Sequence, residues 1–576
     1  MLERWESPDG LDARRALRGG GPLETFNRAG VLTSADVHIA DRICDVAGES
    51  DADVRLAVAL TVRSVRHGSV CLRLEELDLD PDLPWPAIDQ WSTKVAHSAV
   101  VARGALSVTD DAIYLERFLR EETQVLEDLG RRLDAPPLAV PSSEGAAARV
   151  FPGPGYAEQR LAAVTAVGQR TTVLTGGPGT GKTTTVAGIL ALLRDGDPGL
   201  QIALAAPTGK AAARLQESIE QARTGLAPQD AASLAGLTAS TLHRLLVREP
   251  GTTTRFRHHR LNTLPHDVVV VDEASMVSLT MMARLMEAVR ADARLILVGD
   301  PAQLASVEAG AVLADLVEGL RTRAPSAVAA LRTTHRFGGE IGQLSAAVRA
   351  GDVDVAMEVL ENGTVVRLVD ADDRDATAEV RRELTRHAAE VRAAALSGDA
   401  IATAAAADDH RLLCAHRDGP YGAAHWNRQI ERWLAELSGE PIGPGWGREW
   451  YAGRPVLVTA NDYGMRLFNG DTGVAVVQGA GLTVRIGSRD IAPSRLSDVE
   501  TVHAMTVHKS QGGQARRITV MLPELESPLL TRELLYTAIT RAQEQVTIVA
   551  PTGAVEAAIL RPVRRASGLA QRLSSN

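Results

Sequence analysis

The chain has 576 residues, of which 45% are hydrophobic and 23% charged, and its net charge is −10 at pH 7. This length predicts roughly three to five domains, and the composition is that of a globular protein. The net charge excludes a protein that coats DNA, although a local basic groove remains compatible with DNA binding. No apolar run is long enough to cross a membrane. The polar N-terminus and three widely separated cysteines predict a cytoplasmic protein with reduced thiols and no metal cluster.

Residues 1–135 are predicted to be helical. Ser34 can cap one helix and Asp51 a second. The next segment, 136–157, contains five prolines with serines and glycines and is predicted to be a linker. Residues 1–135 contain neither a complete phosphate loop nor a metal-ligand spacing, so we expect no second active site there. Their apolar helix faces form either a core of their own or a surface for a partner.

After the linker, short apolar runs alternate with amphipathic helices, which is typical of an α/β fold with parallel sheets covered by helices. We expect two such domains, at residues 158–322 and 323–576. A stretch rich in arginine and histidine predicts a surface hairpin inserted in the first domain at about 244–262. Short strands separated by turn residues predict a small β-barrel inserted in the second domain at about 454–499.

The segment from Gly176 to Thr183 matches G-x-x-x-x-G-K-[ST] in full and lies between a predicted strand and a predicted helix. Backbone N–H groups of such a loop bind phosphates at a helix N-terminus. Lys182 is expected to reach the β- and γ-phosphates of ATP, and Thr183 to ligate Mg²⁺. A glycine-rich turn that matches by chance is disfavoured by the flanking strand and helix. The loop's ATP contacts are assigned to Gly177, Gly179, Thr180, Gly181, Lys182, Thr183 and Thr184.

Two further strand ends carry polar residues. A buried strand ends in Asp272 and Glu273. Asp272 is expected to hold Mg²⁺ through water, and Glu273 to orient or deprotonate the attacking water. Gln303 follows the next strand and can sense the γ-phosphate. Acidic strand ends and polar turns are common by themselves, so these assignments depend on the phosphate loop upstream.

Lysine is rare in this chain. Only four lysines occur, against 62 lysines and arginines together. Three of them, Lys182, Lys210 and Lys509, lie in motifs that contain Gly, Thr or Ser. Lysine is a compact point charge and arginine a planar fork, so the two are not interchangeable where a tight loop holds a phosphate. This distribution indicates a nucleotide-driven motor that handles nucleic acid.

Eight motifs follow one another along the chain: GGPGTGKTTT, APTGKAAARL, STLHRLL, VDEASMV, GDPAQLASVEAGAV, HRFGG, AMTVHKSQG and LLYTAITRA. They resemble the ordered motifs of superfamily 1 helicases of the 5′→3′ branch, and within it the RecD family, the alpha subunits of bacterial RecBCD (exodeoxyribonuclease V). The segment RHGSVCLRLEEL also resembles the RecD N-terminal domain. The resemblance implies two RecA-like motor domains that clamp ATP between them.

The resemblance also implies roles for single residues. Gln159 would read adenine, and Arg336 and Arg541 would contact the γ-phosphate from the second motor domain. Contacts with single-stranded DNA are implied for Thr208, Lys210 and His243. A link between DNA and the ATP cleft is implied for Thr506, His508 and Gln511. Gln514 departs from the family, which usually has a glutamate there, so a contact made by that carboxylate is not carried over.

The expected function is that of an ATP-dependent 5′→3′ DNA helicase or translocase that processes double-strand ends in recombinational repair, with ATP and Mg²⁺ as cofactors. The expected partners are DNA and, in a heterotrimer, a RecB-like and a RecC-like subunit. The nuclease site is expected on a partner subunit. Residues 1–135 are expected to dock the RecC-like subunit. The alternatives are a self-sufficient RecD-like helicase, a non-catalytic scaffold at DNA ends, and a phosphate-loop ATPase that never touches DNA. A scaffold should carry damaged catalytic residues, whereas these are all present: Lys182, Glu273, Gln303, Arg336 and Arg541.

Overall fold

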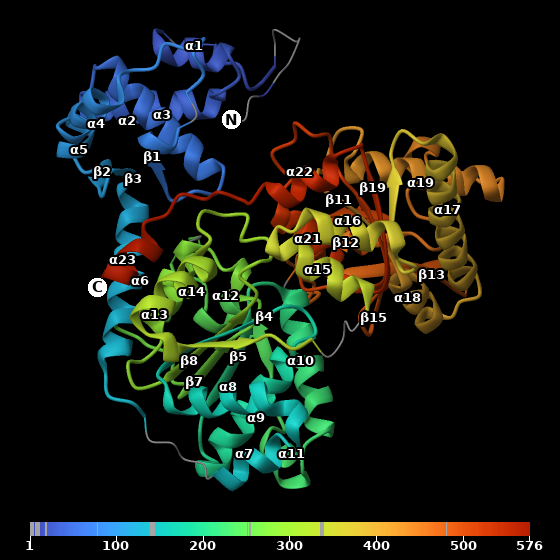
Figure 1. Ribbon diagram of the computed structural model, residues 1–576. Coiled ribbons are helices and arrows are strands. Elements are labelled where there is room, and N and C mark those ends of the chain that lie inside the picture. The colour runs from blue at the N-terminus through green and yellow to red at the C-terminus, as the bar shows by residue number, and fades with distance from the viewer. Residues whose placement is uncertain are drawn as a thin grey trace.

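The computed structural model describes residues 5, 12–17, 20–77, 79–138, 144–249, 251–252, 255–334, 339–462, 464–479 and 481–575. It contains two parallel sheets, of six and five strands, and two antiparallel sheets, of five and three strands. Figure 1 shows the N-terminal region (blue) above the first parallel sheet (green) and the second parallel sheet to one side (orange and red). The predicted α/β class with two parallel sheets is therefore confirmed. Within these ranges no helix is both long and apolar enough to cross a membrane.

The N-terminal region is helical, as predicted, but it also contains a small sheet that the sequence did not predict. Its elements are α1 (Pro22–Arg28), α2 (Ser34–Ala47), α3 (Ala52–Arg66), β1 (Cys71–Arg73), α4 (Ile88–Ala96), α5 (Ala99–Ala102), β2 (Leu106–Thr109) and β3 (Ala112–Leu115). The strands pair antiparallel in the order β1-β3-β2. Strands this short are hard to predict because they hold at most two alternations. Asp51 caps α3 as predicted, whereas α2 is capped by Thr33 and begins at Ser34.

Helix α6 (Glu116–Asp134) runs from the N-terminal region along the first parallel sheet. Val125, Leu126 and Leu129 lie in one hydrophobic core with residues of that sheet and its helices. Arg132 is buried, and its guanidinium donates to Thr171 Oγ1 and to three backbone carbonyls, at 2.5–2.9 Å. Helix α6 is therefore built into the first sheet domain, whereas the sequence analysis placed it before the predicted linker, in the N-terminal region.

The predicted linker, 136–157, is attached to the first sheet domain where the structure describes it. It contains α7 (Glu144–Val150), in which Arg149 forms an ion pair with Asp230 at 2.9 Å. The ring of Phe151 is buried and fills the space beside Gly188, where a Cβ would lie 2.1 Å from it. Pro136, Pro137, Pro152 and Pro154 therefore lie between α-helices, and the described part of this segment is not a free tether.

The first parallel sheet has the strand order β6-β5-β7-β8-β4-β9. Its strands are β4 (Thr171–Gly176), β5 (Ile202–Ala206), β6 (Ala239–Thr241), β7 (Val268–Val271), β8 (Arg294–Gly299) and β9 (Val328–Leu331). Its helices are α8 (Ala157–Gly168), α9 (Lys182–Gly196), α10 (Gly209–Thr224), α11 (Pro228–Ser233), α12 (Leu242–Leu246), α13 (Leu279–Ala288) and α14 (Val312–Arg323). Val269 and Val271 enter one core and Val268 and Val270 another. Both faces are thus covered, which explains the unbroken apolar runs in the sequence.

The second parallel sheet has the strand order β10-β19-β18-β11-β17. Its strands are β10 (Val366–Asp370), β11 (His410–Cys414), β17 (Ala504–Thr506), β18 (Ala515–Met521) and β19 (Ala542–Ala550). Its helices are α15 (Glu340–Ala350), α16 (Val353–Asn362), α17 (Arg374–Leu396), α18 (Ala400–Asp409), α19 (Ala423–Ser438), α20 (Val507–Ser510), α21 (Arg532–Ile539) and α22 (Ala554–Leu560). Leu413 and Leu412 of β11 enter different cores, so this sheet is also covered on both faces.

Both predicted insertions are present as antiparallel structure. The first contains an antiparallel bridge between Arg248 and Phe256, and its Arg260 donates two hydrogen bonds to Asp128 of α6, at 2.8 and 2.9 Å. The second is a five-stranded sheet with the order β15-β14-β13-β12-β16, in which β15 and β16 are the edge strands. Its strands are β12 (Pro455–Val458), β13 (Thr472–Gln478), β14 (Gly481–Ile486), β15 (Arg489–Ile491) and β16 (Val499–Thr501).

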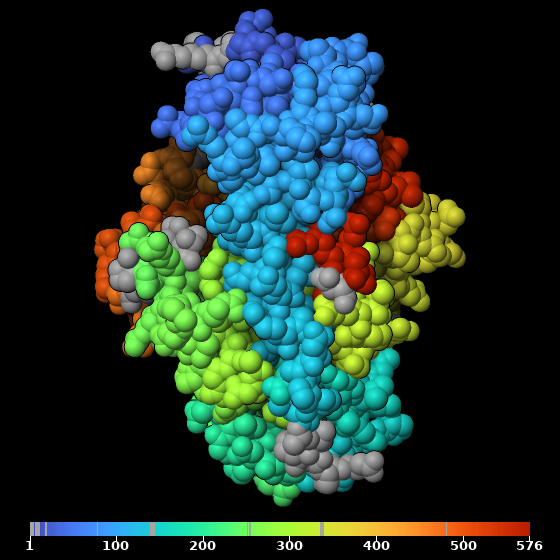
Figure 2. Space-filling model, turned by 90° about the vertical axis from the view of Figure 1, so that its left-hand side faces the viewer, coloured from blue at the N-terminus to red at the C-terminus, as the bar shows by residue number. Residues whose placement is uncertain are grey.

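Residues 561–575, here called the return segment, leave the second sheet domain and pack on the first. The N–H of Val70 donates to the Ala566 carbonyl at 2.8 Å, and Arg565 donates to the Ser306 carbonyl at 2.6 Å. Helix α23 (Leu569–Ser575) buries Leu569 and Leu573 in the core shared by α6 and α14. Figure 2 shows this segment (red) against α6 (cyan). The range 323–576 is therefore not one compact unit.

Candidate ATP cleft between the two parallel sheets

The phosphate loop lies between β4 and α9. Gly179 and Gly181 have φ angles of +77° and +83°, which glycine adopts without the strain that a Cβ would bring. Lys182 is the first residue of α9, and its Nζ donates to the carbonyls of Gly176 at 2.6 Å and Gly177 at 3.0 Å. Lys182 thus lies against the loop that should hold phosphate. Thr183 is partly buried and Thr184 is exposed.

Gln159 lies on α8 and supports the same loop. Its side chain is buried, and its Nε2 donates to the Thr180 carbonyl at 3.3 Å. Thr180 Oγ1 in turn donates to the Gly177 carbonyl at 2.9 Å. These contacts place Gln159 beside the phosphate loop.

Asp272 and Glu273 follow β7 at the same edge of the sheet. The Asp272 N–H donates to the Ala205 carbonyl at 2.9 Å, and the Glu273 N–H donates to Asp272 Oδ1 at 2.9 Å. Glu273 has φ +51°, an uncommon conformation for a residue with a Cβ. Burial raises the pKa of the Asp272 carboxyl, the neighbouring Glu273 raises it further, and Lys182 opposes both. Carboxylate and hydroxyl oxygens are ligands that Mg²⁺ prefers, so Asp272 and Thr183 suit that ion.

Side chains of the second sheet domain reach the first across this edge. Arg541, which follows α21, is buried, and its Nη2 donates to Gln303 Oε1 at 3.1 Å. The Tyr536 hydroxyl donates to Asp300 Oδ2 at 2.8 Å. Burial lowers the pKa of the Arg541 guanidinium, and the nearby charge of Glu273 raises it. The two domains therefore meet where the phosphate loop and the acidic pair also lie.

Gln511 belongs to this junction and not to an open surface. It is buried, and its Nε2 donates to the Leu304 carbonyl at 2.8 Å. The Leu304 N–H donates to Thr537 Oγ1 at 2.9 Å. His508, one turn earlier, is mostly buried, which lowers its pKa, and Arg565 of the return segment lowers that pKa further.

The other candidate DNA contacts lie at the carboxyl ends of strands. Thr208 caps α10 and Thr506 caps α20, accepting hydrogen bonds from the N–H groups of Ala211 and Lys509 at 3.2 and 3.3 Å. His243 follows β6, and burial lowers the pKa of its imidazole. Lys210 differs from these residues because its side chain enters a cavity between the two sheet domains.

Arg336, the other predicted γ-phosphate contact, lies outside the described residues. The structure adds Asp300, Tyr536 and Arg214, to which the sequence analysis gave no role. All three lie inside motifs that were recognised, so their position in the motif was the available signal. In the described part of the chain, no group of three or more His, Cys, Asp or Glu side chains could hold a metal ion.

A phosphate loop on one parallel sheet, faced by an arginine from a second parallel sheet, defines a two-domain ATP-driven motor of the helicase type. Three family descriptions match: "AAA domain" over residues 156–371, "UvrD-like helicase C-terminal domain" over 501–549, and "RecBCD enzyme subunit RecD, N-terminal domain" over 28–114. The chain is 54% identical to the RecBCD enzyme subunit RecD of Mycolicibacterium smegmatis, over 96% of this chain and 99% of that protein. It is 53% identical to the Mycobacterium tuberculosis RecD subunit, over 98% and 99%.

The chain therefore belongs to the RecD family of superfamily 1 DNA helicases. A more distant relative is the ATP-dependent RecD2 DNA helicase of Deinococcus radiodurans, 31% identical over 78% of this chain and 56% of that protein. The lower coverage of RecD2 reflects its greater length. The predicted family, enzyme class and ATP dependence are thus confirmed.

Proposed function

We propose that this RecD-family helicase translocates 5′→3′ on single-stranded DNA and acts at double-strand ends in recombinational repair. Its partners would be RecB-like and RecC-like subunits in a heterotrimer, because its relatives are named as subunits of the RecBCD enzyme. The nuclease site would lie on a partner. The observation that carries the motor assignment is the hydrogen bond from Arg541 of one sheet domain to Gln303 of the other.

The chemistry follows from the groups around the phosphate loop. Lys182 would leave its loop carbonyls to bind the β- and γ-phosphates, and Glu273 would orient or deprotonate the attacking water. Gln303 would contact the γ-phosphate and link it to Arg541 through their hydrogen bond. Mg²⁺, held by Thr183 and by Asp272 through water, would neutralise phosphate charge. Arg541 and Arg336 would stabilise the charge that develops in the transition state. Gln159 would contact adenine.

Movement would come from opening and closing the cleft. Hydrolysis removes the γ-phosphate that Gln303 and Arg541 share, so the two domains would separate and close again on the next ATP. The single strand would be bound on the first domain by Thr208, Lys210 and His243 and on the second by Thr506. His508 and Gln511 would link this DNA binding to the ATP cleft. Binding through DNA phosphates should be salt-dependent and largely independent of sequence.

The domain roles are part of the proposal. Residues 1–135 would dock the RecC-like subunit, the ranges 158–322 and 323–576 would be the two motors, and the insertion at about 454–499 would close into an SH3-like barrel beside the DNA path. Of residues 1–135, helices α1–α5 have a core of their own, whereas β1 and β3 contribute Cys71, Ala112 and Tyr114 to the core of the first motor.

Polarity is the most direct test. Two partial duplexes are needed, one with a 5′ single-stranded tail and one with a 3′ tail, each offered with ATP. We expect unwinding only from the 5′ tail. A Lys182→Gln variant controls for ATP-independent strand separation. Unwinding only from the 3′ tail would reverse the proposed direction while leaving the helicase class intact.

A further inference from the structure

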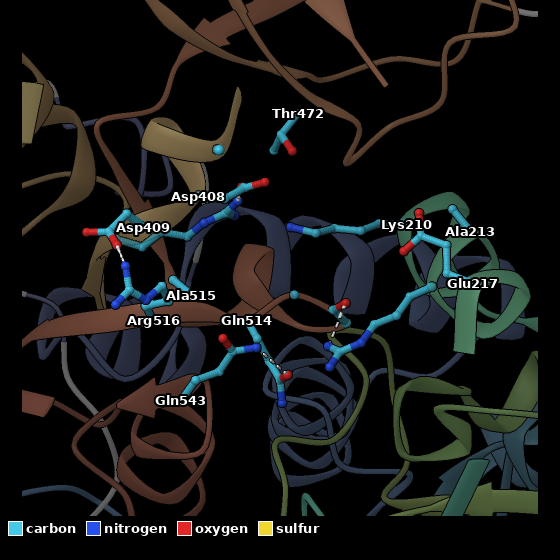
Figure 3. Close-up of a pocket in the computed structure, with 15 residues that line it drawn as sticks. Lys210, Ala213, Glu217, Asp408, Asp409, Thr472, Gln514, Ala515, Arg516 and Gln543 are labelled. Carbon is cyan, nitrogen blue, oxygen red and sulfur yellow. Dashed lines mark hydrogen bonds and ion pairs between the residues drawn. The ribbon is translucent and has the colours of Figure 1, made fainter. Parts of the chain in front are cut away.

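A cavity of about 430 Å³ lies between α10 of the first sheet domain and the edge of the second sheet domain formed by α18, β11 and β18. Figure 3 shows Lys210 extending from α10 into it, opposite Asp408 and Asp409 of α18, with Gln514 on another wall. The cavity opens to solvent and is lined by charged side chains from both domains.

The Lys210 ammonium is the unexplained group in this cavity. The residue as a whole is half-buried, and its Nζ lies in the cavity wall against Gly513, where it is hidden from solvent and has no hydrogen-bond partner among the described residues. A Cβ at Gly513, on the other domain, would lie 2.6 Å from it. Burial lowers the pKa of Lys210 to about 7, and the positive charge of Arg411 lowers it further. A buried ammonium with no partner carries a large desolvation cost.

Arg411, on β11, presents a second unmatched donor. Its Nη2 pairs with Asp408, but its Nη1 is buried without a hydrogen-bond partner in the described structure. The charge of Asp408 does favour charged Lys210, yet no hydrogen bond joins the two residues. Asp409 is held by Arg516 at 2.9 Å and Arg517 at 2.6 Å. Two cationic groups from different domains therefore line one cavity. Asp408 and Asp409 are paired with arginines, and Glu217 of α10 is a third carboxylate in the lining.

We propose that this cavity binds a phosphate-class oxyanion between Lys210 and Arg411, and that the anion joins the two sheet domains. A phosphate has several acceptor oxygens and can take charge-assisted hydrogen bonds from both groups at once. Its source is either a backbone phosphate of single-stranded DNA or inorganic phosphate released by ATP hydrolysis. The second source is near, because Arg214 on α10 donates to the Gly512 carbonyl at 3.1 Å and its charge acts on Asp272.

Inorganic phosphate can be offered without ATP or DNA, so the test does not depend on the proposed helicase mechanism. We would titrate phosphate into the full chain by calorimetry in a Lys182→Gln background, which weakens binding at the phosphate loop. We expect one saturable site, weakened at least tenfold by Arg411→Gln. Arg417→Gln is the matched control, because Arg417 is exposed and pairs with Glu500 outside the cavity. Equal phosphate affinity with and without Arg411→Gln, at unchanged melting temperature, would overturn the proposal.

A second variant tests the location. Gln514 lines the cavity and accepts a hydrogen bond from Gln543 at 3.3 Å, which a glutamate can also accept. Gln514→Glu adds a carboxylate to the lining and should weaken phosphate binding about as much as Arg411→Gln. If Gln514→Glu bound phosphate as tightly as the protein without this substitution, the anion would lie elsewhere, and the proposal would be contradicted.

The source is decided by measuring the affinity for single-stranded DNA at several salt concentrations, with otherwise wild-type protein and with Arg411→Gln. If the cavity takes a DNA phosphate, Arg411→Gln lowers the slope of log affinity against log salt by roughly one, and inorganic phosphate competes with DNA. If it takes free phosphate, the slope is unchanged while phosphate binding is still lost. Either result supports the site and assigns its source.

Discussion

At the scale of single residues, the ATP cleft is built from side chains that the sequence identifies one by one but cannot bring together. The phosphate loop and Asp272 were predictable because a fixed spacing of residue types carries their chemistry. The contact between Arg541 and Gln303 was not, since the two residues are 238 positions apart and the distance between them depends on how two domains meet. The same holds for Tyr536 on Asp300.

Lys182→Gln should lower DNA-stimulated ATP turnover by roughly 10²- to 10³-fold, the usual effect of removing one group that stabilises transition-state charge. The fold should persist, because Lys182 bonds only to carbonyls of its own loop. Turnover and melting temperature measured on the same preparation separate the two effects. Hydrolysis at the wild-type rate would mean that the site is misassigned.

Arg541→Ala should reduce turnover by a similar factor but weaken ATP binding much less, because Arg541 is proposed to contact only the γ-phosphate and the phosphate loop stays intact. Since Arg541 is buried, its removal leaves the groups that accept its hydrogen bonds without a partner. This should also cost about 1–3 kcal/mol of stability. Nucleotide affinity, turnover and urea unfolding are the measurements, with the exposed Arg417→Ala as control. An equal loss of ATP affinity and turnover would contradict the assigned role.

At the scale of elements, sequence patterns succeeded where an element is long and buried on both faces. The strands of both parallel sheets were predictable as unbroken apolar runs, as Val268–Val271 illustrates. Three-residue strands such as β1 were not, and neither was the position of α6, because an amphipathic pattern shows that a helix has an apolar face but not which core receives it. The return segment was missed for the same reason.

Buried histidines should make the second sheet domain sensitive to acid. Burial lowers the pKa values of His387 to about 4 and of His410 and His503 to about 3, and nearby positive charges, including Arg517, add to this. Each is neutral in the fold, whereas the unfolded state takes up a proton near pH 6.5. Stability is therefore complete above that pH and falls as pH drops toward 4, by about 1.4 kcal/mol per pH unit for each histidine.

Urea unfolding at several pH values between 7.5 and 5 checks this dependence. His410→Gln should remove the contribution of one histidine from the slope of stability against pH. The amide of the new side chain can still bond to Thr519, which His410 contacts at 2.9 Å. His38→Gln on the exposed face of α2 is the control. An unchanged slope in His410→Gln would show that acid acts elsewhere.

At the scale of the whole molecule, the N-terminal region, the first sheet and the return segment share one hydrophobic core. Tyr114, Val125 and Leu573 all belong to it. Residues 1–135 are therefore not independent of the first motor. A boundary before α6 removes Cys71 and Tyr114 from the shared core, and a boundary after α6 removes Val125, Leu126 and Leu129 as well.

Removing residues 1–115 should lower the stability of the first motor, because Cys71 and Tyr114 leave its core, but should still leave a DNA-stimulated ATPase that no longer co-purifies with a RecC-like subunit. Removing residues 1–135 should in addition strip Val125, Leu126 and Leu129 from the core, at about 2–5 kcal/mol per large side chain lost, and so unfold the first motor. Melting curves, ATPase assays and co-purification distinguish the two truncations. Equal stability of both would show that α6 is dispensable, and normal assembly of the shorter truncation would refute the docking role.

The return segment also affects the order in which this protein can be completed during synthesis. Ser69 and Ala566, hydrogen-bonded to each other at 3.1 Å, are 497 residues apart. A ribosome has therefore translated both sheet domains before it supplies the helix that covers the core of the first. Until then that core stays open on one side, where the place of Leu573 beside Gly319 is vacant. A stop codon just after α22 would leave the second motor finished and the first one permanently uncovered, so damage at one end of the gene would appear as instability in a domain encoded much earlier.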